Sequence, residues 1–150
     1  MSKRPYGIAV AQLGPIQPQD TRAQCVARLL EMMREAASRG AAQVIALEQE
    51  ADLARLLQQQ AERLKAGMVQ VQRTDAVAAM QRLTAGAFDV VFLDPPFDGP
   101  WFEPALQAAA RLVPVGGWVY LEAPVTWSDE ALAPFGLEPV RHLKAGAVHA

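Results

Sequence analysis

Short apolar runs alternate with helix-like segments along the whole chain, and this alternation limits the possible folds more than any other feature. The runs expected to form strands are residues 6–14, 42–48, 68–75, 88–94 and 118–124. The segments between them have apolar residues at helical spacing and span residues 21–40, 50–67, 76–86 and 101–117. Such alternation predicts βαβ units and a doubly wound, mostly parallel α/β sheet with helices on both faces. The tail, residues 137–150, predicts an antiparallel hairpin.

The size and composition fit one folded domain. With 150 residues, 51% of them hydrophobic and 20% charged, the chain can bury a core and is not of the disordered class. The formal net charge of −2 argues against a strongly cationic nucleic-acid binder. No apolar run reaches about 18 residues, so no transmembrane helix is expected. The first residues of the chain indicate a strand more than a signal peptide. Cys25 is the only cysteine, which excludes an internal disulfide and indicates the cytoplasm.

Acidic residues follow three of the predicted strands, at Glu48, Asp75 and Asp94. Ligands of a parallel α/β sheet bind beyond the carboxyl ends of the strands, so these side chains are expected at the binding edge. An acid after the second strand can accept hydrogen bonds from the ribose hydroxyls of a nucleoside cofactor. An acid after the third strand could accept a hydrogen bond from an adenine amine. The alternative for Asp75 is the N-cap of the following helix.

The fourth strand-like run ends in Asp94-Pro95-Pro96-Phe97, which cannot continue a strand. Each proline fixes its φ near about −65°, and a residue before a proline is kept out of the helical region. The loop therefore holds the Asp94 carboxylate and nearby carbonyl oxygens as fixed acceptors, while Phe97 offers a flat face for a base. Such a loop suits the orientation of a planar exocyclic amine towards a methyl donor. The alternative is a strand-to-helix turn with a core phenylalanine.

From about residue 36 to residue 150, the chain resembles the bacterial methyltransferases that modify a guanine N2 amine in 16S ribosomal RNA. The resemblance rests on residues 37–64, 71–80, 88–106, 116–124 and 143–150. Within them, DPPF matches the [D/N/S]-P-P-[Y/F/W] signature of amino-group methyltransferases. The resemblance implies a Rossmann-like fold of the methyltransferase type, S-adenosylmethionine as the cofactor, and ribosomal RNA of the small ribosomal subunit as the partner.

The resemblance also implies roles for individual residues. Glu48, with its neighbour Gln49, would bind the cofactor ribose, and Asp75, with Ala76, would bind the adenine. The target amine and its base would be held by the loop of Asp94, Pro95, Pro96 and Phe97, in which Asp94 also borders the cofactor.

Residues 7–41 depart from that family and resemble the start of carbon–nitrogen hydrolases of the nitrilase superfamily, especially N-carbamoyl-D-amino-acid amidohydrolases. The stretch AVAQLGPIQPQD stands where the methyltransferases have a glycine-rich loop for the methionine part of the cofactor. We therefore expect one domain of chimeric origin, hydrolase-like over residues 1–40 and methyltransferase-like over residues 41–150, with impaired cofactor binding. The alternatives are a catalytically inactive scaffold and a hydrolase fragment. A hydrolase needs a nucleophilic cysteine after a later strand, whereas Cys25 falls inside the first predicted helix.

Two further expectations concern the surface. His142 and His149 are isolated in the sequence and lack metal-ligand spacing, so they are expected at surface or hairpin positions. Exposed strand edges favour pairing between chains, which would give a homo-oligomer.

Overall fold

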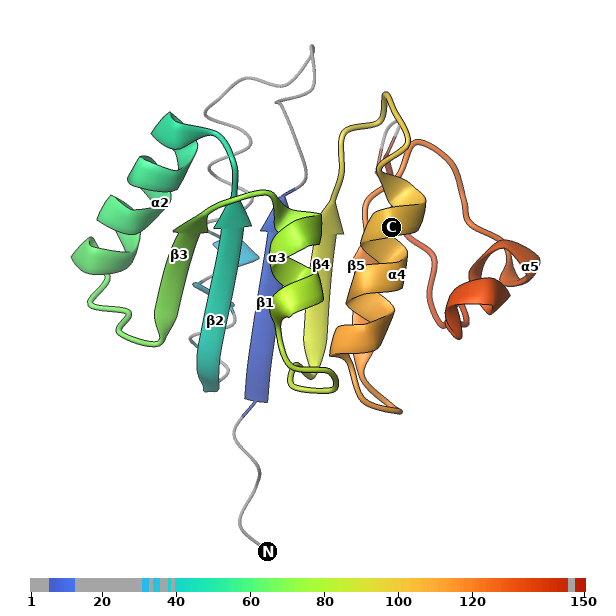
Figure 1. Ribbon diagram of the computed structural model, residues 1–150, viewed down its shortest axis with the longest axis horizontal. Helices are drawn as coiled ribbons and strands as arrows, with labels where there is room; N and C mark the ends of the chain where they lie inside the picture. Colours follow the sequence, from blue (N-terminus) through green and yellow to red (C-terminus); the bar gives the residue numbers. More distant parts are fainter. Residues whose placement is uncertain (1–5, 13–30, 33, 36–37, 39, 146–147) are drawn as a thin grey trace, which may run out of the picture.

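The computed structural model describes residues 6–12, 31–32, 34–35, 38, 40–145 and 148–150. Five strands form one sheet, namely β1 Tyr6–Gln12, β2 Ala41–Glu48, β3 Val69–Arg73, β4 Val90–Asp94 and β5 Trp118–Leu121. Their order is β3-β2-β1-β4-β5, and every neighbouring pair is parallel (Figure 1). The predicted doubly wound parallel sheet is confirmed.

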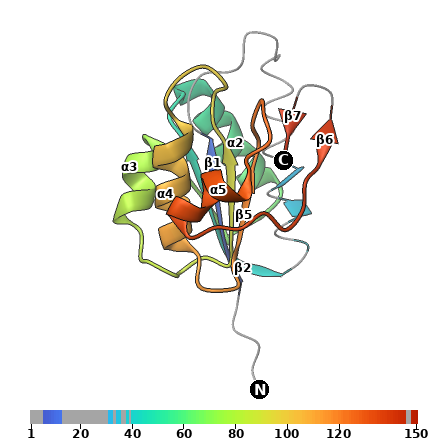
Figure 2. The same ribbon diagram turned by 90° about the vertical axis from the view of Figure 1, so that its right-hand side faces the viewer.

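Helices cover both faces of this sheet. Helix α2, Ala51–Arg63, packs with one set of strand residues, which includes Val44, and helices α3, Ala76–Arg82, and α4, Phe102–Leu112, pack with another. Strand β4 divides its side chains between the two layers, because Val91 and Leu93 join the α3–α4 layer while Val90 and Phe92 join the α2 layer. Successive side chains of a strand point to opposite faces, so β4 is covered on both sides. Figure 2 shows α3 and α4 together on one side of the sheet.

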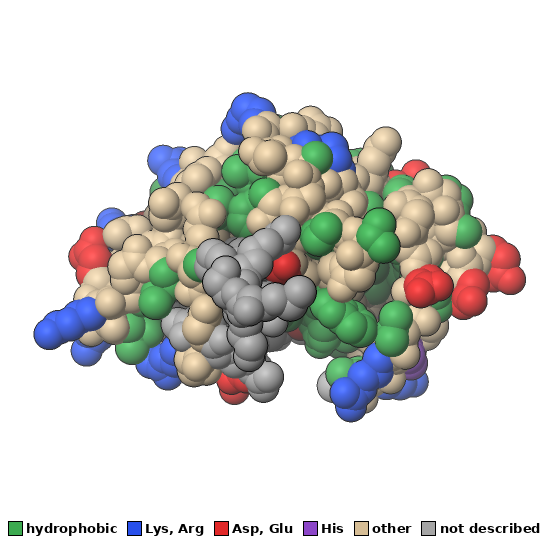
Figure 3. All heavy atoms as spheres, turned by 90° about the horizontal axis from the view of Figure 1, so that it is seen from below, with side chains coloured by type: hydrophobic (Ala, Val, Ile, Leu, Met, Phe, Trp, Pro, Cys, Tyr) green, Lys and Arg blue, Asp and Glu red, His purple; other side chains and the backbone are tan. Residues whose placement is uncertain are grey.

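The face seen from the amino ends of the strands has no single basic patch in its described part. Figure 3 shows Lys and Arg side chains at separate places on this face, while Asp and Glu side chains gather mainly at one end. This distribution agrees with the net charge of −2 and with the expectation that the chain is not strongly cationic.

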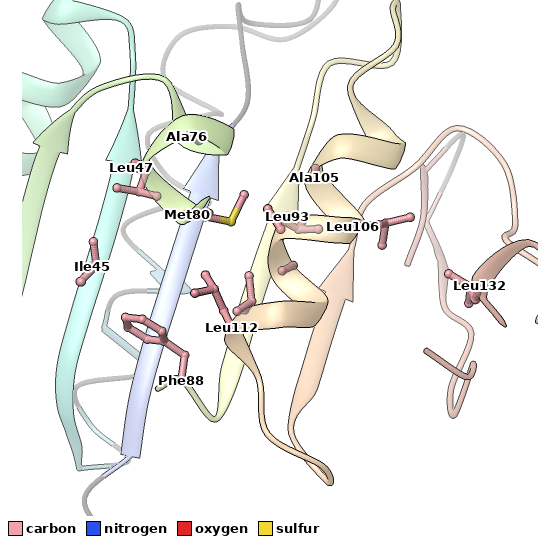
Figure 4. Packing of buried hydrophobic residues seen from close by; sticks show 14 residues of the cluster. Ile45, Leu47, Ala76, Met80, Phe88, Leu93, Ala105, Leu106, Leu112 and Leu132 are labelled. Carbon is pink, nitrogen blue, oxygen red and sulfur yellow. The ribbon is translucent and has the colours of Figure 1, made fainter. Parts of the chain in front are cut away.

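The larger core lies between the sheet and helices α3 and α4. Leu47 and Leu93 from the sheet, and Met80, Leu106 and Leu112 from the helices, are each at most 2% exposed. Figure 4 shows these side chains gathered between β2, β4 and the two helices. Burial of one such side chain contributes roughly 1.5–3 kcal/mol. This layer packs β2 and β4 against α3 and α4.

Several boundaries differ from the sequence-based expectation. Helix α2 ends before Gly67, because Leu64 is its C-cap and Lys65 takes the left-handed conformation with φ of 52°. Of the helix predicted over residues 21–40, the structure describes residues 31, 32, 34, 35 and 38, which are helical, and Gly40, which lies in a turn. The predictions made for Cys25 and for the loop at residues 15–20 lie outside the described residues.

The segment after β5 holds two short elements that the sequence did not predict. Helix α5, Asp129–Leu132, begins at Ser128, whose hydroxyl accepts a hydrogen bond from the Ala131 amide. The 3₁₀ turn η1, Ala133–Phe135, follows directly. Helix α5 has four residues, which is too short to give a periodic apolar pattern.

The predicted antiparallel hairpin at the C-terminal end is confirmed, as β6 Lys144–Ala145 and β7 Val148–His149. Strand β7 also meets the segment after β5, where Ala123 and His149 exchange two backbone hydrogen bonds of 2.8 Å. Among the described residues, no helix combines the length and the apolarity that spanning a bilayer requires.

Candidate functional site

The carboxyl ends of the five parallel strands lie at one edge of the sheet, which is the upper edge in Figure 1. The chain runs outward from β1 to β2 and β3, and then returns to β4 and β5 on the other side of β1. The order therefore reverses between β1 and β4. Open α/β sheets bind their ligands at such a switch point. Gln12 and Asp94 are partners in register across it, and Glu48 ends the strand on the far side of β1.

Glu48 is the buried acid of this edge. Its side chain is 0% exposed, and its Oε1 accepts a 2.8 Å hydrogen bond from the backbone amide of Glu50. Its Oε2 has no hydrogen-bond partner within the described part of the chain. Burial raises the pKa of the Glu48 carboxyl to about 7, and the negative charges of Glu50 and Asp94 add to the rise. The structure thus holds a carboxyl group that titrates near neutrality and has one oxygen ready for a donor.

The turn after β2 leads directly into α2. The Glu50 carboxylate caps this helix by accepting hydrogen bonds of 3.2 Å from the amides of Asp52 and Leu53. Capping holds the turn in place. The turn then positions the Glu50 amide to donate its hydrogen bond to Glu48. Gln49 lies between them with an exposed side chain. The role of Glu50 was not predicted, because glutamate is not among the usual N-cap residues Ser, Thr, Asp and Asn.

Asp75 lies two residues beyond the last residue of β3 and forms the N-cap of α3. Its Oδ1 accepts a 2.7 Å hydrogen bond from the Ala78 amide. The N-cap alternative is therefore confirmed. The side chain is exposed, and the Thr74 amide bonds to the Glu48 carbonyl at 3.0 Å, which ties this turn to the end of β2. Ala76 begins the helix and is buried. The assignment of Asp75 and Ala76 to an adenine stays a prediction.

The Asp94–Phe97 loop leaves the sheet at the switch point. Pro95 and Pro96 are buried, while Asp94 and Phe97 are half-buried. The two prolines are therefore packed into the protein. The Asp94 carboxylate before them and the Phe97 ring after them remain partly accessible. The buried prolines support the expectation of a fixed loop. The assignment of its residues to a target amine stays a prediction.

Gly99 and Trp101 continue this loop towards α4. Gly99 has φ of 121°, and a Cβ added there would lie 2.6 Å from Nε1 of Trp101. The indole of Trp101 therefore lies against the glycine backbone, and it is 41% exposed. Phe102 has a different environment, because its ring stacks at 5.9 Å on Trp127 next to the core. Of the two aromatic residues, Trp101 is the more exposed, because Phe102 is half-buried.

His142 and His149 lie at surface and hairpin positions, as expected from the sequence, but the structure brings them together. Nε2 of His142 and Nδ1 of His149 are 3.1 Å apart, and the Thr126 hydroxyl lies within 3.3 Å of both. The hairpin brings them together, because Lys144 pairs with His149 and His142 is two residues away on the same strand side. Diagonal neighbours on an antiparallel pair are within reach of long side chains. The register of the hairpin, once assumed, would have revealed this pair.

Comparison with known proteins agrees with the fold. The family model described as Conserved hypothetical protein 95 matches residues 31–150. No curated protein sequence matches the chain. The Escherichia coli protein yhhF, provisionally named a methyltransferase, aligns with a TM-score of 0.62 and 20% identity, over 95% of this chain and 71% of that one.

Two further solved structures show the same fold. A conserved hypothetical protein of Streptococcus pyogenes aligns with a TM-score of 0.65 and 22% identity, over 96% of this chain and 83% of that one. A Pyrococcus horikoshii protein, provisionally named an RNA methyltransferase, aligns with a TM-score of 0.56 and 20% identity. The alignment covers 90% of this chain and 62% of that one. The α/β fold of this chain is thus the one found in methyltransferases, and the chain belongs to the family described as Conserved hypothetical protein 95.

Proposed function

We propose that the protein transfers a methyl group from S-adenosylmethionine to the exocyclic amine of a guanine in ribosomal RNA. The observation that carries the proposal is the Asp94–Phe97 loop, whose two prolines are buried and whose acid and ring stay partly accessible at the switch point of the sheet. The fold, the family and the provisional names of two structural neighbours support a methyltransferase, and one of those names supports RNA as the substrate.

The residues at the edge fit a nucleoside cofactor. Glu48 offers a buried Oε2 without a partner in the described structure, and a ribose hydroxyl would supply the hydrogen bond that this oxygen lacks. Asp75 and Ala76 stand at the entrance of α3 on the neighbouring strand, where they would meet the adenine. Because Glu48 has no exposed surface, binding requires some movement at this edge.

The chain's own residues would position the substrate. S-adenosylmethionine, when bound, supplies the electrophilic methyl group. The Asp94 carboxylate and the loop carbonyls would accept hydrogen bonds from the guanine amine and so aim its nitrogen at the donor. Phe97 would stack on the base, an interaction worth about 1–3 kcal/mol. Catalysis in this proposal comes from orientation by a loop that the prolines hold fixed.

We also propose that residues 1–40 have a separate, nitrilase-like origin. The family model begins at residue 31, so most of this segment lies outside the match. The segment replaces the glycine-rich cofactor loop, so we expect weak binding of S-adenosylmethionine. Calorimetric titration tests this point, since a dissociation constant in the micromolar range would contradict the expected weakening.

Transfer of radiolabelled methyl groups to small-subunit ribosomal RNA tests the activity, and nucleoside analysis of the product identifies the methylated atom. Asp94→Ala should abolish transfer, while Asp98→Ala, at an exposed acid four residues further on, should leave it nearly unchanged. Equal activity of the two variants would remove the assigned role of Asp94. A cooperatively folded protein with no transfer under any condition would instead favour the inactive scaffold. Pairing of chains through the edge of β5, where Trp118 is 55% exposed, stays a prediction.

A further inference from the structure

Three polar atoms converge at the surface next to the C-terminal hairpin, which pairs with the segment after β5. They are Oγ1 of Thr126, Nε2 of His142 and Nδ1 of His149, and their mutual distances are 3.3, 3.1 and 3.1 Å. We propose that Thr126, His142 and His149 form a binding site for a divalent transition-metal ion of the class that prefers imidazole, such as Zn²⁺ or Ni²⁺.

Three linear hydrogen bonds cannot form among these atoms at the same time. The relevant nitrogen of a neutral imidazole is either a donor or an acceptor, and the hydroxyl has one hydrogen. A chain of two hydrogen bonds links the three atoms, and the third short contact then shares one of those protons in a three-centre bond or has none. A metal ion at the centre of the triangle would use a lone pair of each atom at once.

The dimensions agree with metal coordination. Two Zn–N bonds of about 2.0–2.1 Å at a tetrahedral angle place their nitrogens about 3.3–3.4 Å apart. The observed separation of 3.1 Å between the two ring nitrogens needs only a slight opening. The ring centroids are 5.1 Å apart and the rings are inclined at 37°, so the imidazoles are not stacked face to face. Water would complete the coordination sphere.

The backbone holds the three residues in place before any ion binds. His149 exchanges two backbone hydrogen bonds with Ala123, and Leu143, next to His142, exchanges two with Ala150. Thr126 follows Ala123 by three residues and precedes Trp127, which packs on Phe102 and Phe135. An ion would therefore connect the segment after β5 to the hairpin (Figure 2).

Charge limits the expected affinity. Lys144 pairs with His149 across the hairpin, which places a positive charge near the proposed site. The same Lys144 ammonium repels a divalent ion. Among the described residues, no group of three or more His, Cys, Asp or Glu side chains could hold a metal, so the proposed site has only two of these side chains beside Thr126. With two imidazoles and a hydroxyl, we expect micromolar affinity.

Titration of the full, untagged chain at pH 7.5 with ZnCl₂ and NiCl₂, followed by calorimetry and thermal melting, tests the site. We expect one ion per chain and a melting temperature higher by roughly 5–10 °C at a hundredfold excess over the dissociation constant. MgCl₂ should have no effect, because magnesium prefers oxygen ligands.

Variants separate this site from adventitious binding. His142→Ala and His149→Ala should each weaken zinc binding at least tenfold, and Thr126→Val should weaken it several-fold. Lys144→Met should tighten it, which binding elsewhere on the surface would not show. If both histidine variants bind zinc as the parent does, or if the parent shows no binding below 1 mM, which is roughly a thousandfold weaker than micromolar affinity, the proposal is overturned and the pair is a hydrogen-bonded contact only.

Discussion

The backbone amide of Glu50 donates a 2.8 Å hydrogen bond to Oε1 of Glu48, so the turn after β2 holds one oxygen of a fully buried carboxyl group in place. The other oxygen is buried without a partner in the described part of the protein. A group in this state destabilises the fold when it is ionised, and it is available to a ligand that can donate a hydrogen bond. Stability and ligand binding should therefore both depend on the protonation of Glu48.

The Glu48→Gln variant should gain stability over the parent as the pH rises. Burial raises the pKa of Glu48 from 4.5 to about 7, so between these values the folded state keeps a proton that the unfolded state has released. Stability of the parent then falls as the pH rises through this window, by up to roughly 3 kcal/mol at about 1.4 kcal/mol per unit. Glutamine carries no charge and escapes this loss.

Thermal melting at pH 5, 6, 7 and 8 measures the effect as the difference in melting temperature between the variant and the parent. The difference should grow in favour of Glu48→Gln up to about pH 8. The exposed Glu138→Gln serves as the matched control and should show no such trend. A constant difference between Glu48→Gln and the parent at every pH would contradict the prediction.

Substitution of Gly99 by alanine should disturb the loop between Asp94 and α4. The position has φ of 121°, and the added Cβ would meet the Trp101 indole at 2.6 Å. Gly86→Ala also has a positive φ but adds no atom within 4 Å of a neighbour, and Gly67→Ala has neither problem. We expect Gly99→Ala to be the most destabilising of the three in urea unfolding. An equal loss for Gly99→Ala and Gly86→Ala would mean that the indole moves aside at little cost.

The parallel sheet could be predicted from the sequence because its strands are short apolar runs that end in clear turn signals. Val90–Asp94 is such a run, and the prolines after it mark its end without ambiguity. The same local chemistry indicated a helix cap as the alternative for Asp75, since capping depends only on the next few residues. Local signals of this kind gave the order of the elements and the residues placed at the carboxyl edge.

The environment of the site residues could not be predicted in the same way. Glu48 is an acid at a strand end, and only the surrounding packing decides that it is 0% exposed and that one oxygen lacks a partner. The contact between His142 and His149 depends on the register of a hairpin whose strands have two residues each. Burial and register arise from tertiary structure, which leaves little trace in a single sequence.

Arg111 should stabilise α3 from outside that helix. Its Nη2 donates hydrogen bonds of 2.6, 3.0 and 2.7 Å to the carbonyls of Met80, Gln81 and Leu83, which lie at the C-terminal end of α3. The last four carbonyls of a helix lack the usual amide partner in the next turn, and the Met80 carbonyl has a long bond of 3.3 Å from the Leu83 amide. Arg111→Met keeps much of the aliphatic stem and removes the donors, so we expect a loss of about 1–3 kcal/mol in the free energy of unfolding.

Urea denaturation of Arg111→Met, compared with Arg141→Met in an exposed loop, measures this contribution. The loop variant should change the midpoint very little. If both variants unfold at the same urea concentration, the three hydrogen bonds contribute nothing net, and α3 is held by Met80 and its apolar neighbours alone.

Binding of S-adenosylmethionine should strengthen as the pH rises from 6 to 8, if the ribose donates a hydrogen bond to Glu48. The ionised carboxylate is the stronger acceptor, and the pKa of about 7 means that it is the minority form at pH 6 and the majority form at pH 8. The dissociation constant should fall by up to about tenfold over this range. Titration at millimolar cofactor detects weak binding. Glu48→Gln should bind with little pH dependence, whereas Glu138→Gln should keep the parent profile. A parent profile that survives in Glu48→Gln would place the cofactor ribose away from Glu48, because the titrating group would then lie elsewhere.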